Sequence, residues 1–357
     1  MSPAQNNTIP AKAYAVFADD SPFKVFDFER RTPRVDDVVI RIHYCGICHS
    51  DIHHVYNEWK KETYPLVPGH EITGVVEQVG SSVKHFSVGD HVGVGCVVDT
   101  CLKCEPCKKH KEQHCPDVCY TYGSTELDKV TPTHGGYSNL VTVKEHFVCK
   151  IPNNLPLDAA APLLCAGITT YSPLRQYNVG KDSRIGVVGL GGLGHMGVKL
   201  GAAMGAHVTV ISTSESKRND AIKLGAKAFL VSKDKEQMKT AANSLDLIID
   251  TVSAPHDVNA LIDLLKFEGV YCLVGAPPKP LEIGAFPLIM KRPIITGSNI
   301  GGMKETQEML DFCGKHNIVC DIEKIQATPE TIKTAYDRTV KSDVKYRFVL
   351  DMLNAFK

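Results

Sequence analysis

The sequence lacks the features that mark several special classes of protein. Its 40 Lys and Arg balance its 40 Asp and Glu, so no overall field favours nucleic acid or an anionic membrane as a partner. The longest nearly apolar stretch, around Asp158–Ile168, is far shorter than the roughly 20 residues needed to span a bilayer. It has no internal repeat, no low-complexity segment and no start resembling a secretory signal. We therefore expect a soluble, cytoplasmic protein.

The sequence is long and apolar enough for a substantial core. Its 357 residues are 43% hydrophobic, which at roughly 100–200 residues per domain predicts about two domains. The first 150 residues or so carry β-rich runs such as Val38–Ile42 and Val75–Val79. From about Leu163 onward, apolar strands alternate with helical segments, a pattern typical of βαβ units. We expect an α/β chain with an irregular β domain and a parallel-sheet domain.

A glycine-rich turn follows the first strand of the predicted parallel sheet. The apolar run Ile185–Val188 precedes glycines with GxGxxG spacing, and a helix follows. Gly189 would permit the tight turn, Gly191 would let a pyrophosphate approach the backbone, and Gly194 would let the helix pack closely on the strand. A dinucleotide site is predicted; the alternative is glycines that only turn a loop.

The residues after the second strand indicate which dinucleotide binds. An NAD site needs an acidic residue there to hold the ribose, but Val208–Ile211 runs into Ser212, Thr213 and Ser214. Lys217 and Arg218 follow closely. Hydroxyls and cations suit a 2′-phosphate, so NADP(H) is the predicted coenzyme. An ordinary polar helix cap with solvated basic residues is the alternative.

The 13 cysteines indicate metal ligation better than disulfides, because their number is odd and the expected compartment is reducing. Four of them crowd one short loop at spacings that suit a closed, tetrahedral structural zinc: Cys101, Cys104, Cys107 and Cys115. A [4Fe–4S] cluster is an alternative, although its last spacing would be three residues rather than seven. Disulfide pairing is the other.

A second set of candidate ligands is scattered along the chain. Cys48, His70 with the adjacent Glu71, and Cys165 occupy three separate segments. Catalytic zinc takes three protein ligands and leaves a fourth position open, and two thiolates with one imidazole would suit it. Taken singly, each residue could equally be a buried cysteine or a hydrogen-bonded histidine.

Several motifs together carry a family resemblance: GICHSDIH, VPGHEITGVV, the four-cysteine loop, PLLCAGITTYSPL, GLGGLGHMGVKL, STSESK and DVKYRFV. The chain resembles the zinc-containing medium-chain dehydrogenases of the cinnamyl alcohol dehydrogenase type, close to broad-range aldehyde reductases. The resemblance implies a GroES-like β domain (residues 1–160 and 300–357) and a Rossmann domain (161–299). It also implies an active site between them, two zinc ions per chain and a homodimer joined through the Rossmann sheets.

The resemblance also implies roles for individual residues. Cys48, His70 and Cys165 become the catalytic zinc ligands, and Glu71 becomes a carboxylate that can approach the metal. Ser50 and His53 match a proton relay, and Asp51 matches the brace of the ligand histidine. The implied coenzyme contacts are Thr169, Gly189, Leu190, Gly191, Gly192, Leu193, Gly194, Ser212, Thr213, Ser214, Lys217, Thr251, Gly275, Asn299, Ile300 and Gly301.

The expected activity is reversible hydride transfer between NADPH and small-molecule aldehydes or primary alcohols. Tyr120 and Asn299 stand where cinnamyl enzymes carry aromatic pocket residues, which favours a broad range of aldehydes over a lignin-type substrate. Trp59 could line the pocket or pack at the surface. One alternative is a polyol or other secondary-alcohol dehydrogenase, which generally has a carboxylate at the Cys165 position. Another is a non-catalytic dinucleotide-binding relative, which would have lost ligands.

Overall fold

The chain folds into two compact units in a computed structural model that describes residues 8–277 and 279–357. The first unit comprises Met1–Cys165 and Gly302–Lys357, and the second comprises Ala166–Gly301. The sequence placed the first boundary after residue 160, but the short 3-10 helix η3 (Ala161–Leu164) packs on strands of the first unit and keeps Cys165 there. Among the described residues, no helix is both long and apolar enough to cross a membrane.

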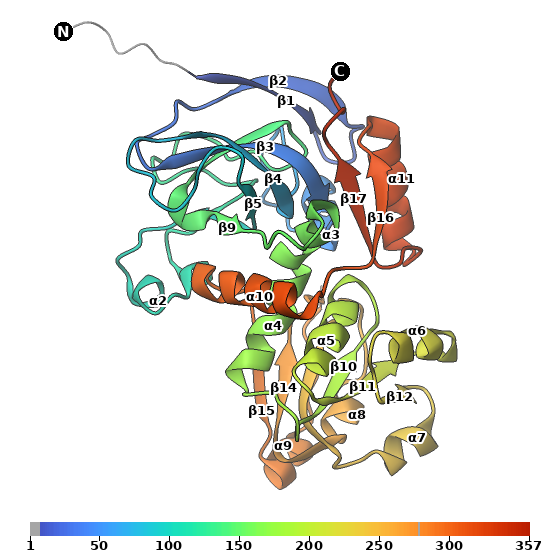
Figure 1. Ribbon diagram of the computed structural model, residues 1–357. Coiled ribbons are helices and arrows are strands. Elements are labelled where there is room, and N and C mark those ends of the chain that lie inside the picture. The colour runs from blue at the N-terminus through green and yellow to red at the C-terminus, as the bar shows by residue number, and fades with distance from the viewer. Residues whose placement is uncertain (1–7, 278) are drawn as a thin grey trace, which may run out of the picture. The chain divides into compact units, whose positions relative to one another are not determined.

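The first unit is built around a seven-stranded, mostly antiparallel sheet with the order β16-β17-β3-β4-β5-β9, in which β8 also pairs with β3 (Figure 1). Two small two-stranded sheets, β1-β2 and β6-β7, accompany it. The strand bounds are β1 Ile9–Ala15, β2 Lys24–Arg30, β3 Asp37–Gly46, β4 Ile72–Val79, β5 His91–Val94, β6 Val97–Asp99, β7 Cys119–Tyr120, β8 Leu140–Lys144, β9 Cys149–Lys150, β16 Ile322–Gln326 and β17 Arg347–Asp351.

Strand β3 organises this unit because it pairs with β4, β8 and β17. Its residues Val38–Ile40 are fully or almost fully buried, as expected for a central strand with apolar neighbours. The helical segments of the unit are α1 His49–Val55, α2 Glu105–Lys108, η1 Glu112–His114, η2 Glu145–Phe147, α3 Leu157–Ala160, η3, α10 Met303–His316 and α11 Pro329–Val340. Helix α1 begins directly after β3, so the end of the central strand delivers the first candidate ligand.

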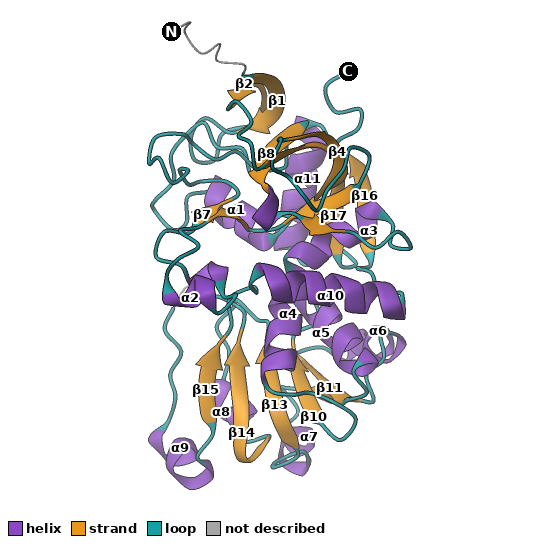
Figure 2. Cartoon of the chain, turned by 60° about the vertical axis from the view of Figure 1, so that its left-hand side comes forward, coloured by secondary structure: helices purple, strands orange, loops and turns teal. Residues whose placement is uncertain are grey.

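The second unit is a six-stranded, wholly parallel sheet with the order β12-β11-β10-β13-β14-β15. Figure 2 shows strands of this sheet side by side, with their arrowheads at the same end. The strands are β10 Arg184–Val188, β11 His207–Ser212, β12 Ala228–Val231, β13 Leu245–Asp250, β14 Leu265–Leu273 and β15 Ile294–Gly297. This is the Rossmann order 3-2-1-4-5-6, and it confirms the predicted α/β fold class.

Long apolar runs explain why these strands lie inside a parallel sheet covered by helices. Four of the five residues of β10 are buried, as are five of the six in β11. Helix α5 contacts β10 and β11, whereas α8 and α9 contact β14. The helical segments are α4 Ala166–Gln176, α5 Gly192–Ala203, η4 Glu215–Lys217, α6 Arg218–Lys223, α7 Lys235–Thr240, α8 Val258–Ile262 and α9 Ala285–Lys291. The strand order reverses between β10 and β13, and ligands of such sheets bind at the carboxyl edge there.

Candidate active site and coenzyme site

The four scattered candidate ligands come together in the first unit. Cys48 caps the N-terminus of α1, His70 and Glu71 immediately precede β4, and Cys165 follows η3. All four are buried, and their ligand atoms lie within 4.8 Å of one another. The Cys48 and Cys165 Sγ atoms are 3.9 Å apart. Because Zn–S bonds of about 2.3 Å in a tetrahedron separate two sulfurs by about 3.8 Å, this spacing suits a shared zinc ion.

The orientation of His70 tests whether the cluster fits a metal. Its Nδ1 faces Asp51 Oδ1 at 3.3 Å. Its Nε2 is buried and has no hydrogen-bond partner among the described residues. Asp51 is held in place by the backbone N–H groups of Cys48, at 2.8 Å, and Gly69, at 3.2 Å. This arrangement leaves the Nε2 lone pair as a free ligand, as in histidines that bind metals through one nitrogen and a carboxylate through the other.

Charges around the cluster are balanced by a buried cation that the sequence did not single out. Arg347, at the start of β17, places its Nη2 3.2 Å from Glu71 Oε1. Burial raises the pKa of Glu71 to about 8, while Arg347 opposes that rise. Gly46 makes room for this carboxylate, because a Cβ there would overlap it. Only the fold identifies Arg347, since a lone arginine before an apolar strand carries no local signal.

The two thiols of the cluster differ in acidity. The contact between their sulfurs lowers the pKa of Cys48 well below its usual range and raises that of Cys165. A third thiol, Cys96, neighbours Cys165, and this proximity lowers the pKa of Cys96 to about 6 despite burial. Sequence reasoning missed Cys96 because it lies just outside the four-cysteine loop. Its sulfur is a further polarisable group beside the candidate ligands.

The predicted proton relay lies on α1. Ser50 and His53 are three residues apart in this helix, so their side chains share a face. His53 Nδ1 lies 2.5 Å from Glu58 Oε2, a residue that the sequence analysis did not identify. In the neutral ring, donation to Glu58 leaves Nε2 as the acceptor. The ring of Trp59 packs 5.1 Å from that of His53, so this tryptophan lies beside the predicted relay.

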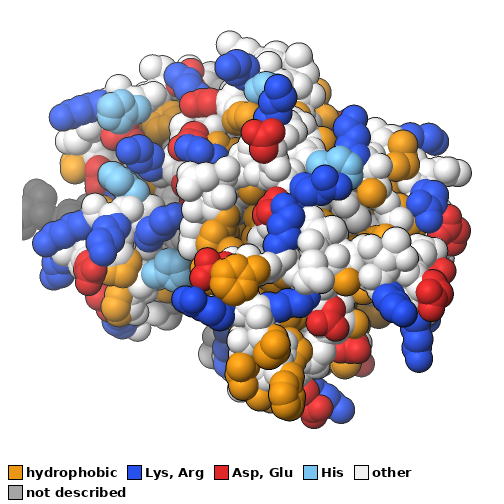
Figure 3. All heavy atoms as spheres, turned by 90° about the horizontal axis from the view of Figure 1, so that it is seen from below, with side chains coloured by type: hydrophobic (Ala, Val, Ile, Leu, Met, Phe, Trp, Pro, Cys, Tyr) orange, Lys and Arg blue, Asp and Glu red, His pale blue; other side chains and the backbone are white. Residues whose placement is uncertain are grey.

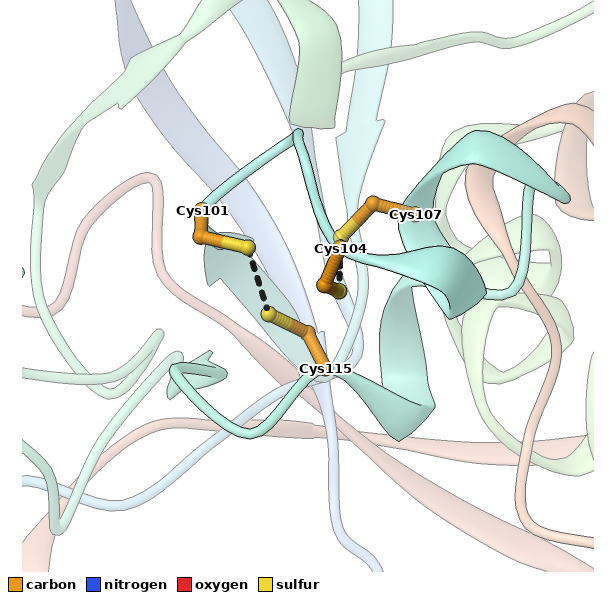
Figure 4. A group of neighbouring side chains, drawn as sticks. All are labelled: Cys101, Cys104, Cys107 and Cys115. Carbon is orange, nitrogen blue, oxygen red and sulfur yellow. Dashed lines mark hydrogen bonds between the residues drawn. The ribbon is translucent and has the colours of Figure 1, made fainter.

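The four cysteines of the short loop also converge, and Figure 4 shows their sulfurs pointing toward one another. Two pairs of Sγ atoms, Cys101 with Cys115 and Cys104 with Cys107, are each 3.4 Å apart. Backbone N–H groups of Lys103 and Cys104 lower the pKa of Cys101 to about 6. This cluster consists of thiols alone, whereas the first also offers an imidazole and a carboxylate.

The loop that carries the four cysteines is anchored to α10, whose N-terminal end lies next to α2 in Figure 1. Glu112 is almost fully buried and accepts hydrogen bonds from His146 Nε2, at 3.0 Å, and from the Met303 backbone N–H, at 3.1 Å. Burial alone would raise the pKa of Glu112, but these hydrogen bonds lower it below 4.5. These hydrogen bonds therefore connect the loop to the N-terminus of α10, at the start of the segment Gly302–Lys357.

The glycine-rich turn in the second unit joins β10 to α5. Gly189 has a φ of +86°, and a Cβ on Gly194 would overlap the Gly189 carbonyl. Gly191 is the N-cap of α5, and its missing Cβ leaves open space. The exposed backbone at this helix N-terminus is suited to a pyrophosphate. Leu190, Gly192 and Leu193 complete the predicted turn.

The hydroxyl-rich segment lies beside this turn. Ser212 ends β11, Thr213 follows, and Ser214 is the N-cap of η4. Lys217 Nζ donates to the Leu190 carbonyl at 3.4 Å, so one cation reaches the glycine-rich turn. Arg218 instead pairs with Glu215 and lies over the Phe229 ring, with its Cζ 4.8 Å from the centroid. The sequence predicts that Lys217 and Arg218 both bind a phosphate. Because Arg218 has other partners, Lys217 is the better candidate.

The remaining predicted coenzyme residues are only partly brought together. Thr251 donates to the Val188 carbonyl at 2.7 Å, and the Gly275 N–H donates to the Asp250 carbonyl at 2.9 Å, so both lie at the carboxyl edge of the sheet. Thr169 is buried in α4. The segment Asn299–Gly301 follows β15 and ends the second unit. Roles for Thr169 and for this segment stay predictions.

Comparison with known proteins identifies the family. The alcohol dehydrogenase GroES-like domain matches residues 34–153, and the zinc-binding dehydrogenase domain matches residues 192–315. An 8-hydroxygeraniol dehydrogenase from Catharanthus roseus is 55% identical over 98% of this chain and 97% of its own length. A cinnamyl alcohol dehydrogenase 2 from Rauvolfia serpentina is 54% identical over 100% of this chain and 99% of its own length. The chain belongs to the zinc-containing alcohol dehydrogenases of the cinnamyl type. A mannitol dehydrogenase from Petroselinum crispum is 56% identical over 94% of this chain and 99% of its own.

Solved structures agree with this alcohol dehydrogenase family. A cinnamyl alcohol dehydrogenase from Sorghum bicolor has a TM-score of 0.94 and 46% identity, covering 97% of this chain and 98% of that one. The CAD of Helicobacter pylori complexed with NADP(H) has a TM-score of 0.91 and 44% identity, covering 98% and 100%. The first unit thus contains the GroES-like domain, and the second is the Rossmann-type domain.

Proposed function

We propose that this dehydrogenase is a zinc-dependent, NADPH-linked aldehyde reductase that also oxidises primary alcohols. The observation that carries the proposal is the buried cluster of Cys48, His70 and Cys165, in which the unpartnered Nε2 of His70 faces two thiols spaced for zinc. We propose Cys48, His70 and Cys165 as the ligands of a catalytic zinc, with Glu71 as an alternate ligand held by Arg347. Cys101, Cys104, Cys107 and Cys115 would hold a second, structural zinc.

The residues around the catalytic cluster would orient the substrate and move one proton. When bound, zinc supplies a Lewis acid for the carbonyl oxygen and NADPH supplies the hydride. Ser50 is proposed to donate a proton to the oxygen that becomes the alcohol. His53 is proposed to restore that proton from solvent, with Glu58 holding its ring by the Nδ1 contact at 2.5 Å. In the oxidative direction the same groups would accept the proton.

The NADPH assignment rests on the segment Ser212–Lys217. No carboxylate follows β11 directly, so the ribose partner of an NAD site is missing, and the Lys217 ammonium lies at the glycine-rich turn. A relative with 44% identity is complexed with NADP(H), which supports the same choice here. The proposed coenzyme site comprises Thr169, Gly189–Gly194, Ser212, Thr213, Ser214, Lys217, Thr251, Gly275 and Asn299–Gly301.

The substrate range is proposed to be broad. Tyr120 is 41% exposed, and Asn299 replaces an aromatic residue expected in cinnamyl enzymes. Relatives with over 50% identity are named for substrates as different as 8-hydroxygeraniol and mannitol. Because Cys165 occupies the position at which polyol dehydrogenases acting on secondary alcohols generally carry a carboxylate, we favour aldehydes and primary alcohols, among which the terminal hydroxyl groups of mannitol also count.

We also propose a homodimer formed through the second unit. Helix α9 exposes Phe286, Ile289 and Met290 to 78%, 69% and 72%, and Ile294 on the edge strand β15 is 49% exposed. Figure 3 views the molecule from the side on which α9 lies in Figure 1, and hydrophobic side chains gather there. An unpaired edge beside an apolar face is typical of an interface. Ile289→Asp should yield monomers by sedimentation velocity; an unchanged mass would contradict this interface.

Coenzyme-dependent turnover tests the proposed function. Wild-type enzyme should oxidise NADPH with a panel of aliphatic and aromatic aldehydes, and NADH should support much lower kcat/KM. Ser212→Asp should reverse this preference, because the new carboxylate can bind the ribose diol and repels a 2′-phosphate. The loss of one or two charge-assisted contacts predicts roughly ten- to a thousandfold weaker NADPH. Equal use of both coenzymes by the wild type would overturn the NADPH assignment.

A further inference from the structure

A buried polar cluster at the carboxyl end of β13 contains no proposed zinc ligand, relay residue or coenzyme contact. It consists of Asp250, the last residue of β13, Tyr271 on β14 and His256 in the loop before α8. The Asp250 and Tyr271 side chains are fully buried, and that of His256 is 17% exposed. A buried carboxylate in an apolar sheet is costly unless it is fully hydrogen-bonded.

Both carboxylate oxygens of Asp250 have hydrogen-bond partners. Its Oδ2 accepts from the Tyr271 hydroxyl at 2.7 Å and faces His256 Nε2 at 2.9 Å, while Oδ1 accepts from the Val252 N–H at 3.0 Å. The other ring nitrogen of His256 lies 2.9 Å from the Ala254 carbonyl. A carbonyl and a carboxylate can only accept, so the ring is the donor in a hydrogen bond at either nitrogen. The ring of His256 thus spans the Asp250 carboxylate and the Ala254 carbonyl.

The backbone held by this cluster borders the glycine-rich turn. Thr251 Oγ1 and Val252 Cγ2 would each lie 3.0 Å from a Cβ on Gly189. The carbonyl of Asp250 itself accepts the backbone N–H groups of Val274 and Gly275, each at 2.9 Å. The turn after β13 is thus fixed between the end of β10 and the end of β14, where the strand order of the sheet reverses.

We propose that Asp250, His256 and Tyr271 form a clamp that positions the turn Thr251–Ser253 to receive the coenzyme. The proposal rests on the coenzyme site proposed above. The three are positioning residues, because they act through the backbone of the turn. The clamp does not involve Ser212 or Lys217, so it should affect NADPH and NADH alike. That equality distinguishes it from the residues proposed to select the 2′-phosphate.

The test measures coenzyme binding directly, by the fluorescence of the reduced nicotinamide on titration of the zinc-loaded enzyme. His256→Gln keeps a polar side chain of similar size but loses the rigid ring that spans Asp250 and the Ala254 carbonyl. It should weaken NADPH and NADH by the same factor, at least about tenfold, as expected for a lost charge-assisted hydrogen bond. The kcat at saturating NADPH should be retained, since the reacting groups are unchanged. Hydrogen exchange at Val252, Val274 and Gly275 should accelerate.

A matched control lies at the opposite end of β13 and β14, where Lys266 is on β14 and Asp246 is on β13. Lys266 pairs with Asp246 at 2.7 Å near the start of β13, so Lys266→Met removes an ion pair from β13 without touching the clamp. It should leave coenzyme binding unchanged. Tyr271→Phe, which removes one hydroxyl and keeps the ring, provides a milder second variant and should weaken both coenzymes less than His256→Gln does.

The outcomes separate this inference from the proposed function. If wild-type enzyme binds NADPH but folded His256→Gln and Tyr271→Phe bind it equally tightly, the clamp is wrong. If either variant changes the NADPH to NADH ratio, the proposed positioning role is also wrong, because the clamp lies away from the selecting residues. If the wild type binds no NADPH, the coenzyme assignment fails first.

Discussion

The two cysteine-containing clusters of this protein differ in composition, burial and origin. The four-cysteine cluster comes from residues 101–115, and two of its four members are only partly buried. The other draws on three distant segments and is buried throughout. It adds an imidazole and a carboxylate to its thiols, and a buried arginine lies against the carboxylate. Four thiols close a coordination sphere, whereas a mixed set with a displaceable carboxylate can leave a position open.

The difference teaches how each cluster depends on the fold. The compact cluster needs only a short loop, and its metal would stabilise that loop. The buried cluster exists only after β3, η3 and β4 have packed, so the fold must supply its geometry. Removing a ligand from the four-cysteine cluster should therefore affect stability, and removing one from the buried cluster of Cys48, His70 and Cys165 should affect catalysis.

The largest expected effect is on turnover. Cys165→Ser should lower kcat/KM by more than about a hundredfold, because loss of the ion removes stabilisation of charge that develops on the substrate oxygen. Circular dichroism should show an intact fold. Cys149→Ser, which replaces a buried thiol of the same unit outside both clusters, is the control and should remain active. Substantial activity in Cys165→Ser would show that the buried cluster is not required for catalysis.

The second prediction concerns stability. Cys104→Ser should lower the melting temperature by on the order of 10 °C, since loss of a structural metal is among the most destabilising single changes. The folded fraction should keep near-normal kcat, because this cluster holds no substrate. Calorimetry and an assay below the transition measure both. A variant that melts normally but has lost turnover would show that the assigned roles are reversed.

The third prediction concerns His53 in the proposed proton relay. His53→Ala should slow turnover by up to about a hundredfold through proton transfer, with ligands and fold unchanged. His53→Gln can still hydrogen-bond to Glu58 but cannot shuttle a proton, so it should be equally slow. Added imidazole should restore part of the rate in His53→Ala. A pH–rate profile identical to that of the wild type would show that His53 has no catalytic role.

The smallest expected effect is the pH dependence of the four-cysteine loop. Hydrogen bonds from His146 and Met303 lower the pKa of Glu112 in the folded state, so the carboxylate stabilises the fold above the unfolded pKa. That contribution is lost as pH falls through the lowered folded pKa. Glu112→Gln should thus be less stable than wild type at neutral pH, and the gap should close in acid. Glu105→Gln, at an exposed site in the loop, should show no such gap.

The sequence predicts the four-cysteine cluster from local spacing alone, but it does not predict the buried cluster in this way. Ligands at fixed short spacing and a GxGxxG after an apolar strand are local patterns, and the two-domain α/β fold followed from alternating strands and helices. The meeting of Cys48, His70 and Cys165 came from family resemblance, because no local rule links distant segments. Arg347, Glu58 and the Asp250 clamp were missed, since their significance depends on which neighbours the fold brings to them. The sequence also suggests Arg218 as a phosphate ligand, but in the structure Arg218 pairs with Glu215.

The most direct test of the central claim is metal analysis of three proteins prepared in parallel by plasma mass spectrometry. Wild type should contain two zinc ions per chain, and Cys165→Ser and Cys104→Ser should each contain one. The remaining ion should support stability in Cys165→Ser and turnover in Cys104→Ser. A single zinc in the wild type, or the visible absorbance of an iron–sulfur cluster, would contradict the account.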